Sequence, residues 1–320
     1  MFFRGQTIGK YRILSSLGSG GFGTVYLAED TMIKKKVALK VPHKQNVNLL
    51  KEAQLLASMS HPNIVSVLTA EKQDDVVFIV MEYVPGETLE SLILREGVLD
   101  LTRAMDFSCQ ICNAVGHAHD VGILHRDIRP GNMLVTEGGM LKVSDFGTSR
   151  YLEIAAHGTT VIGSPPYMAP EQFYGKAVFA SDIYSVGVTM YQMLTGSMPY
   201  DTPSPADIAR LERGEFLSSP RIKNPKIPKA INDIVLRAMA PDPIGRYQRA
   251  SELLNDLLAA REPVPRRAAR RGGTATADPT VAEIQSRLKA RETPPARFCW
   301  HCRKPLHART DRCPFCNESQ

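Results

Sequence analysis

The stretch from Leu124 to Gly147, LHRDIRPGNMLVTEGGMLKVSDFG, constrains the fold of this chain more than any other. Two short apolar runs in it flank the pair Gly138-Gly139, which predicts a β-hairpin because glycine tolerates positive φ. The open ends of that hairpin bring Asn132 and Asp145 together. Their hard oxygen atoms, with phosphate oxygens, suit Mg²⁺. Asp127 enters the hairpin at a point from which it can take a proton from an incoming hydroxyl.

This stretch resembles the catalytic loop of protein kinases, His125-Arg126-Asp127 through Asn132, followed by the metal-binding Asp145-Phe146-Gly147. Both motifs occur in order and at hairpin spacing, whereas a lone Asp-Phe-Gly is a common accident. The resemblance to bacterial eukaryotic-like Ser/Thr protein kinases covers roughly residues 11–260. It implies an α+β fold with an antiparallel β-rich N-lobe and a helical C-lobe. It also implies transfer of the ATP γ-phosphoryl group to protein Ser/Thr hydroxyls, with Mg²⁺ or Mn²⁺ on Asn132 and Asp145.

A glycine-rich segment from Gly18 to Gly23 lies between strand-like runs at 11–16 and 24–29. Four glycines in six residues let the backbone approach a ligand and offer N–H groups to phosphate. A Gly-x-Gly-x-x-Gly alone is also compatible with a dinucleotide-binding turn, but the residues after Gly23 read as a strand and not as a helix. We therefore expect a loop that covers the phosphates of ATP.

Lys40 lies in a third predicted strand, 36–41, and a strand lysine is usually solvated. The helix predicted over 47–59, however, places Glu52 on one stripe with apolar residues. A carboxylate that faces inward needs a cation, because its desolvation is costly. Lys40 is the natural partner, and the resemblance implies that Glu52 positions Lys40 on the ATP phosphates.

The apolar run from Val76 to Met81 predicts a buried strand, and Glu82-Tyr83-Val84 after it resembles the hinge whose backbone holds adenine. By the resemblance, Met81 is the gatekeeper. The full set of nucleotide-contacting residues that the resemblance implies is Leu17, Gly18, Gly20, Gly23, Val25, Ala38, Lys40, Met81, Glu82, Val84 and Leu134.

The segment that ends in Ala169-Pro170-Glu171 is rich in hydroxyls and is similar to a kinase activation segment. A phosphate on Thr159 or Thr160 would pair with the Arg126 guanidinium and order the segment. We expect autophosphorylation there, between two copies of the chain. An ordinary polar loop is the alternative for either threonine alone.

Two helices are predicted after the hinge. The first, over 101–121, carries Cys109 and Cys112, which we interpret as packing residues and not metal ligands. The second, over 181–194, is apolar nearly all round and begins at Asp182, which either caps it or reaches the catalytic loop. The resemblance favours the catalytic loop, and it pairs Arg246 with Glu171.

Arg129 departs from the family pattern, which has lysine two residues after the catalytic aspartate. Arginine keeps the positive charge near the transferred phosphoryl group but changes reach and hydrogen-bond geometry. With Ser164, a cation at position 129 still favours Ser/Thr over Tyr as the acceptor. The alternative function is a weakly active kinase-fold scaffold that signals through the C-terminal end of the chain.

The C-terminal end of the chain differs from the rest in its charge. The net charge of the chain is +6, yet residues 261–320 alone hold 13 Lys/Arg and 6 Asp/Glu. The rest of the chain has 26 Lys/Arg and 27 Asp/Glu and is therefore nearly neutral. We divide the chain into an extension (1–10), a kinase domain (11–260, lobes 11–83 and 84–260), a basic Pro/Arg-rich linker (261–296) and a last module (297–320). The arginines could contact nucleic acid or acidic lipid, although a solvated linker is the favoured interpretation. No apolar run reaches the ~18 residues of a membrane span, so we expect a cytoplasmic protein.

The last module contains two Cys-x-x-Cys turns, Cys299 with Cys302 and Cys313 with Cys316, separated by ten residues. Four thiolates suit one tetrahedral structural Zn²⁺, which so short a segment needs because it cannot bury an adequate core. His301 or His307 could replace a cysteine, and a redox pair is the alternative. We predict a zinc ribbon that recruits a protein partner.

Overall fold

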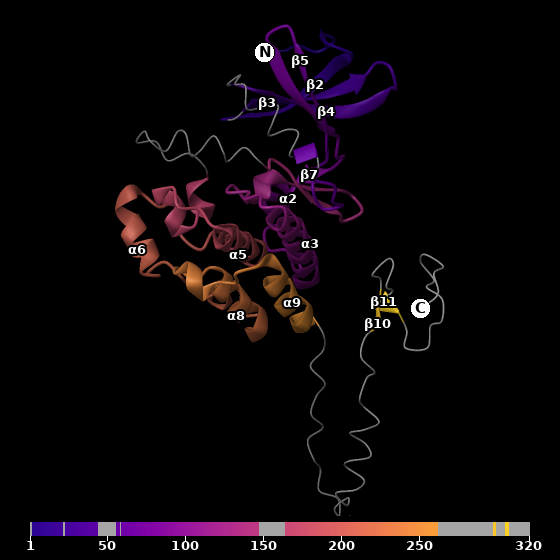
Figure 1. Cartoon of the computed structure of the whole chain (residues 1–320). Helices are drawn as coiled ribbons and strands as arrows, with labels where there is room; N and C mark the ends of the chain where they lie inside the picture. The colour runs from indigo at the N-terminus through magenta and orange to yellow at the C-terminus, as the bar shows by residue number, and fades with distance from the viewer. Residues whose placement is uncertain are drawn as a thin grey trace, which may run out of the picture. The chain divides into compact units, whose positions relative to one another are not determined.

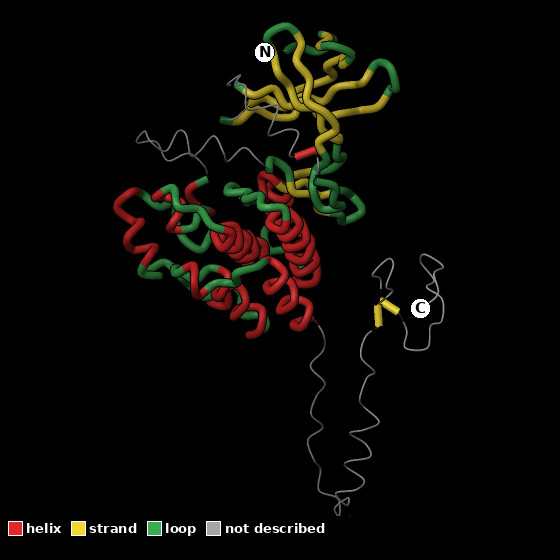
Figure 2. The backbone as a smooth tube through the Cα atoms, viewed as in Figure 1, coloured by secondary structure: helices red, strands yellow, loops and turns green. Residues whose placement is uncertain are grey.

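The computed structural model describes residues 2–21, 23–43, 56–57, 59–146 and 164–261, together with the backbone of 297–298 and 305–306. The chain divides into two compact units, Met1–Pro263 and Val264–Gln320. The first unit contains a β-rich N-lobe and a helical C-lobe, as the resemblance implies (Figures 1 and 2).

The N-lobe is a six-stranded antiparallel sheet in the order β1-β2-β3-β4-β6-β5. Its strands are β1 (Thr7–Ile8), β2 (Tyr11–Gly20), β3 (Gly23–Asp30), β4 (Lys35–Pro42), β5 (Val67–Gln73) and β6 (Val76–Glu82). The strands predicted at 24–29, 36–41 and 76–81 are confirmed as β3, β4 and β6. The sheet also includes β1, so the first ten residues contribute a strand to the lobe.

Side chains alternate between the two faces of this sheet, as the period of a strand requires. One face packs a small apolar core of Ile8, Tyr11, Ile13, Tyr26, Ala28, Val37, Leu39, Phe78 and Val80. Along β3 the residues between these, Val25 and Leu27, are only half-buried and point to the opposite face. The sheet therefore has one core face and one face left for other contacts.

The glycine-rich segment is not a separate loop. Strand β2 continues through Gly18 to Gly20 and pairs with β3, with Gly18 opposite Val25 and Gly20 opposite Gly23. Irregularities between Ile13 and Ser15 and between Ser16 and Gly18 shift the register of this pair. Paired glycines extend the ladder because backbone hydrogen bonding does not need a side chain, so the predicted loop is a hairpin tip.

The second, smaller sheet has the order β7-β8-β9, from β7 (Glu87–Thr88), β8 (Met133–Val135) and β9 (Leu141–Val143). The predicted hairpin is confirmed, since Met133 pairs with Val143 and Val135 with Leu141. Its turn ends at Gly139, which has a φ of +77° and needs a glycine for that reason.

The C-lobe helices are α2 (Leu89–Glu96), α3 (Leu101–Asp120), α5 (Phe179–Thr195), α6 (Ile208–Glu212), α7 (Pro220–Lys223), α8 (Lys229–Ala238) and α9 (Ala250–Arg261). Short 3-10 turns are η1 (Pro130–Asn132), η2 (Pro165–Tyr167), η3 (Pro170–Tyr174), η4 (Pro205–Asp207) and η5 (Pro243–Gly245). Asp100 caps α3 by accepting from the backbone N–H groups of Thr102 and Arg103.

Helix α5 is the centre of the C-lobe. It is buried nearly all round, as its apolar sequence predicts, and packs against α3 and α8 (Figure 1). Cys109 and Cys112 are free, buried thiols on α3, which agrees with a packing role. Burial raises the pKa of the Cys112 thiol, so it stays protonated.

The second unit has only four residues whose backbone is described. Strands β10 (Arg297–Phe298) and β11 (Pro305–Leu306) pair antiparallel, with Arg297 opposite Leu306. Within the described part of the chain, no helix combines the length and apolar character that a bilayer crossing requires.

Candidate active site

A buried carboxylate on α5, that of Asp182, accepts hydrogen bonds from the backbone of the catalytic loop. Asp182 accepts from the backbone N–H groups of His125, at 2.9 Å, and Arg126, at 2.8 Å, and its Oδ2 lies 2.8 Å from His119 Nε2. Arg126 has a φ of +65°, a conformation that a non-glycine residue adopts only when its surroundings impose it. Asp182 therefore reaches the catalytic loop, as the resemblance favours.

The charge state of Asp182 follows from these contacts. Burial by itself would raise the pKa of the carboxyl group. The hydrogen bond and charge of His119, the charge of His125 and the His125 N–H outweigh burial, so the pKa of Asp182 is lowered overall. The group is thus an anion at neutral pH, and its negative charge strengthens the hydrogen bonds that it accepts.

Asp127 and Asn132 are joined directly. The Asn132 Nδ2 donates to Asp127 Oδ2 at 2.9 Å and to the Asp127 carbonyl at 2.8 Å. Because these bonds fix the amide nitrogen, the amide oxygen of Asn132 is the end that is left for a ligand. The Asp127 side chain is 10% exposed, so its carboxylate is oriented and still accessible.

Asp145 follows β9, and Ser144 before it donates its backbone N–H to the Asn132 carbonyl at 2.8 Å. The φ of Asp145 is +63°, which makes it a second strained residue at the site. Lys40 Nζ on β4 donates to Asp145 Oδ1, so this pair joins the N-lobe sheet to the residue after β9. Burial would raise the pKa of Asp145, but the charge and hydrogen bond of Lys40 lower it overall.

The predicted nucleotide residues of the N-lobe share one face of its sheet. Val25 lies directly opposite Lys40, and Ala38 directly opposite Met81. Directly opposed residues project to the same face, and here it is the face without the small core. Val84 is buried just beyond β6, and Leu134 is half-buried on β8 between two core residues.

Packing within the protein requires glycine at only some positions of the hairpin tip. A Cβ at Gly23 would lie 2.5 Å from the Val41 carbonyl oxygen, so the fold needs glycine there. A Cβ at Gly18 or Gly20 would meet no described atom within 4 Å. Glycine at these two positions fits the close approach of a ligand to the backbone. Leu17, beside them, is 49% exposed.

The Glu82 side chain forms an ion pair that the sequence did not predict. Its carboxylate accepts from Lys142 Nζ at 2.7 Å and from the Ser66 N–H at 2.8 Å. Burial would raise the pKa of Glu82, but Lys142 and Ser66 lower it overall. Sequence reasoning missed this pair, although a lysine between the apolar residues of β9 was a signal that one face of that strand meets a charge.

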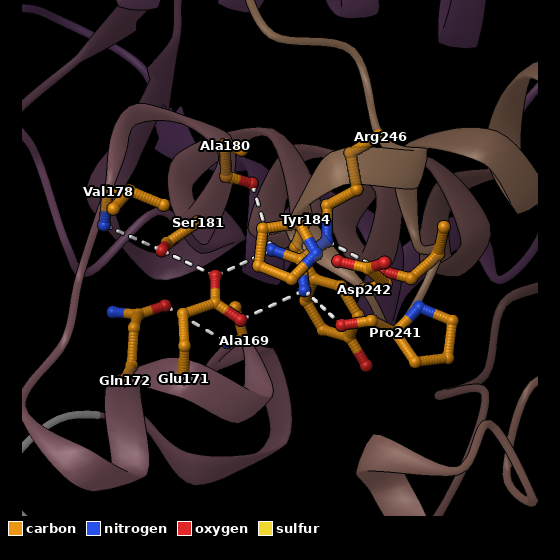
Figure 3. Close-up of polar contacts among 12 residues, drawn as sticks. Ala169, Glu171, Gln172, Val178, Ala180, Ser181, Tyr184, Pro241, Asp242 and Arg246 are labelled. Carbon is orange, nitrogen blue, oxygen red and sulfur yellow. Dashed lines mark hydrogen bonds and ion pairs between the residues drawn. The ribbon is translucent and has the colours of Figure 1, made fainter.

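A second buried ion pair joins Arg246 and Glu171 within the C-lobe (Figure 3). Arg246 donates to both oxygens of Glu171, at 2.6 and 2.9 Å, which confirms the predicted pair. Its other N–H groups donate to the carbonyls of Ala240, Ala180 and Pro241, so all five donors of the guanidinium have acceptors. Next to Glu171, Gln172 donates to the Arg126 carbonyl at 3.0 Å and ties this segment to the catalytic loop.

Several predicted site residues lie outside the described part of the chain. They are Glu52, the phosphorylation candidates Thr159 and Thr160, and the cysteines Cys299, Cys302, Cys313 and Cys316. The pairing of Glu52 with Lys40 therefore stays a prediction. Among the described residues, no three His, Cys, Asp or Glu side chains gather as a metal site.

Comparison with known proteins gives a consistent result. The family model "Protein kinase domain" matches residues 11–267. Serine/threonine-protein kinase PrkC of Bacillus subtilis is 38% identical over 262 residues, which cover 79% of this chain and 40% of PrkC. Serine/threonine-protein kinase PknB of Mycobacterium tuberculosis is 34% identical over 265 residues, covering 78% and 42%.

Among solved structures, the crystal structure of Rad53 1–466 in complex with AMP-PNP superposes with a TM-score of 0.67 at 26% identity. The match covers 77% of this chain and 64% of that one. The chain spans about two fifths of the length of the curated relatives that it matches.

Proposed function

Because this chain belongs to the protein kinase family, we propose that it transfers the γ-phosphoryl group of ATP to serine and threonine hydroxyls of proteins. The observation that carries the proposal is a pair of contacts between residues of the predicted site. Asn132 on η1 donates to Asp127 in the catalytic loop, and Lys40 on β4 donates to Asp145, which follows β9. The relatives of this chain in the comparison are named serine/threonine-protein kinases or probable ones, and the family model matches its residues 11–267.

Each residue has a role that its surroundings permit. Asp127, oriented by Asn132, accepts the proton of the acceptor hydroxyl. The amide oxygen of Asn132 and the carboxylate of Asp145 would hold Mg²⁺ or Mn²⁺, whose charge offsets that of the ATP phosphates when they are bound. Lys40 would hold those phosphates, positioned by Glu52. Catalysis is then mainly orientation and charge stabilisation.

The nucleotide site follows from the shared sheet face. We propose that Val25, Ala38, Met81 and Leu134 contact adenine and that the backbone of Glu82 and Val84 hydrogen-bonds to its edge. The backbone from Leu17 through Gly18 and Gly20 to Gly23 would lie over the phosphates. Support comes from the space at Gly18 and Gly20, where a Cβ would meet no described atom within 4 Å.

The experiment that tests this function is transfer of labelled γ-phosphate onto the chain itself and onto a generic basic protein. We expect label on serine and threonine in the wild type and none in Asp127→Ala. Thermal unfolding and ATP binding of the variant serve as controls for folding. If the wild type binds ATP but labels nothing above the variant, the scaffold alternative holds.

We further propose that Thr159 or Thr160 is phosphorylated by a second copy and that the phosphate pairs with Arg126. Arg126 belongs to the catalytic loop, and its strained backbone is hydrogen-bonded to Asp182 and Gln172. A phosphate that pairs with the Arg126 side chain would therefore act directly on this loop. In the double variant Thr159→Ala/Thr160→Ala we expect slower activation that no longer depends on protein concentration. Full activity without a change in lag would contradict this.

For the last unit we propose a structural zinc ribbon held by Cys299, Cys302, Cys313 and Cys316. Support comes from β10 and β11, which pair antiparallel and flank the first Cys-x-x-Cys in the sequence. Thiolates kept for a metal need a reducing compartment, so we place this unit in the cytoplasm, where it would recruit a protein partner. Mass spectrometry of the native protein should show one zinc per chain, lost in Cys299→Ser/Cys302→Ser.

A further inference from the structure

The guanidinium of Arg129 occupies a defined place beside the proposed base. Its Nε lies 3.6 Å from Asp127 Oδ2, and its Nη1 lies 3.8 Å from Glu90 Oε1 on α2. The Nε atom is buried and has no hydrogen-bond partner among the described residues. A buried donor without an acceptor is costly, so its position needs an explanation.

Gly131 supplies the space for this guanidinium. A Cβ at position 131 would lie 2.5 Å from Arg129 Nη1, 3.0 Å from Arg129 Cζ and 3.3 Å from Glu90 Oε2. The backbone of Gly131 does not have a positive φ, so the turn itself accepts any L-residue. The obstacle to a side chain at position 131 is therefore the arginine head group and not the fold.

A lysine would need less room than arginine. Its Nζ would take about the place of Arg129 Cζ, 3.0 Å from a Cβ at position 131, and the contact at 2.5 Å would be absent. The guanidinium is a planar fork with two terminal nitrogens, whereas the lysine side chain ends in a single ammonium nitrogen. A lysine at position 129 would place no atom where Nη1 now lies over Gly131. Where the family pattern has lysine, this chain has Arg129, and two residues accommodate its larger head group: Gly131 leaves space and Glu90 supplies a carboxylate.

We propose that Gly131 and Glu90 are positioning residues that hold the Arg129 guanidinium against Asp127 for phosphoryl transfer. Gly131 leaves room for the Nη1 end, and Glu90 attracts it, so that Nε faces the Asp127 carboxylate and the incoming groups. The open hydrogen bond of Nε is then completed by the phosphoryl or acceptor oxygen during the reaction. The proposal rests on the kinase function proposed above.

A double-mutant cycle between positions 129 and 131 tests it. In the wild-type background, Gly131→Ala pushes the flexible guanidinium aside, and we expect kcat to fall about tenfold or more with little change in the KM for ATP. In the Arg129→Lys background, the same Gly131→Ala change should alter kcat less than about twofold. Equal factors in the two backgrounds would overturn the proposal, because a purely structural role of Gly131 does not depend on residue 129.

Glu90→Gln tests the second positioning residue, since it keeps the size of the side chain and removes its charge. We expect kcat to fall several-fold with Arg129 and to stay nearly constant with Arg129→Lys. Gly138→Ala, in the nearby hairpin turn, is the matched control, because the closest atom to its Cβ is Thr136 Oγ1 at 4.0 Å. It should leave both kcat and the unfolding midpoint unchanged.

A crystal structure of Gly131→Ala provides a readout that does not depend on activity. We expect an unchanged backbone with the Arg129 guanidinium displaced from Asp127. A guanidinium that stays in place refutes the proposal, even if the wild type proves inactive. A wild type without phosphotransfer refutes the proposed function alone, so the two failures are distinguishable.

Discussion

Two buried charges, Asp182 and Arg246, fix the geometry of the site at the scale of single residues. Both are almost inaccessible to solvent, and each meets several hydrogen-bonding groups. Removing one member of such a network leaves the rest charged and unpaired, which costs more than the pair itself contributes. Each residue therefore gives a sharp stability prediction.

Arg246→Met should lower the free energy of unfolding by about 3–5 kcal/mol, because the Glu171 carboxylate then lies partly buried without a cation. Urea denaturation measures the loss. Arg213→Met is the matched control, since Arg213 pairs with Glu215 at the surface and its removal should change little. Losses of equal size would mean that burial of the Glu171 pair is unimportant.

Asp182→Asn should destabilise the fold by about 3 kcal/mol at neutral pH. The folded pKa of Asp182 lies below the ordinary 3.8, so its contribution is present above that pH and is lost as pH falls through the lower folded value. The difference in unfolding free energy between wild type and variant should therefore shrink only below about pH 4. Glu137→Gln, in the exposed turn, is the matched control and should leave the unfolding free energy at neutral pH unchanged. A difference that stays constant down to the lowest pH at which the protein is folded would contradict this prediction.

At the scale of elements, α5 approaches α8 so closely that one position tolerates no side chain. A Cβ at Gly187 would lie 2.8 Å from Met239 Cγ and 2.9 Å from Ala238 Cβ. We expect Gly187→Ala to destabilise the fold by about 1–3 kcal/mol in a denaturant titration.

Gly116 on α3, in contrast to Gly187, has room for a side chain. The Cβ of Gly116→Ala would lie 3.6 Å from Ala250 Cβ, an ordinary contact, so this change should stabilise the fold by about 0.5–1 kcal/mol. Effects of the same sign at Gly187 and Gly116 would contradict the packing difference.

The link between Glu82 and Lys142 joins the strand before the hinge to the strand before Asp145. Lys142→Met leaves the Glu82 carboxylate with the Ser66 N–H alone, and we expect about 1–2 kcal/mol less stability. Because the hinge loses its anchor, the KM for ATP should rise several-fold while kcat changes less. Steady-state kinetics at varied ATP will show this, and a fall in kcat alone would contradict it.

The elements differ in how far the sequence predicts them. The β8-β9 hairpin and helices α3 and α5 follow from local turn chemistry and periodicity, which act within a few residues. Strand β2 was predicted to end at Ser16 but continues to Gly20, because its pairing with β3 is tertiary and glycine gives no local sign of it. The Glu82–Lys142 and Glu90–Arg129 contacts join segments far apart in the chain, so no spacing could indicate them.

At the scale of the whole molecule, the chain consists of two compact units with different charge. Of the 39 Lys/Arg residues, 12 lie in the second unit, residues 264–320, together with 5 Asp/Glu. The remaining 27 Lys/Arg, in the first unit, are balanced by 28 Asp/Glu. The second unit is too short to bury a core of its own, so its stability should depend on the proposed zinc.

Metal removal should therefore act on one unit alone. With a zinc chelator, we expect faster amide hydrogen exchange in peptides from residues 297–320 and no change in peptides from α3 and α5. Mass spectrometry reads both units in one experiment. Equal exchange with and without the chelator would exclude a structural metal in the last unit.

The ion pair between Lys40 and Asp145 has a consequence for the order of events at the site. Each group is at present the counter-ion of the other, although one is suited to phosphate and the other to a cation. A phosphate that draws Lys40 away releases the Asp145 carboxylate for a metal, and a metal on Asp145 releases Lys40 for phosphate. If phosphate and metal bind as proposed, either ligand would break the same contact before the other arrives. The two would then bind with positive cooperativity, and each would strengthen the binding of the other by the same factor.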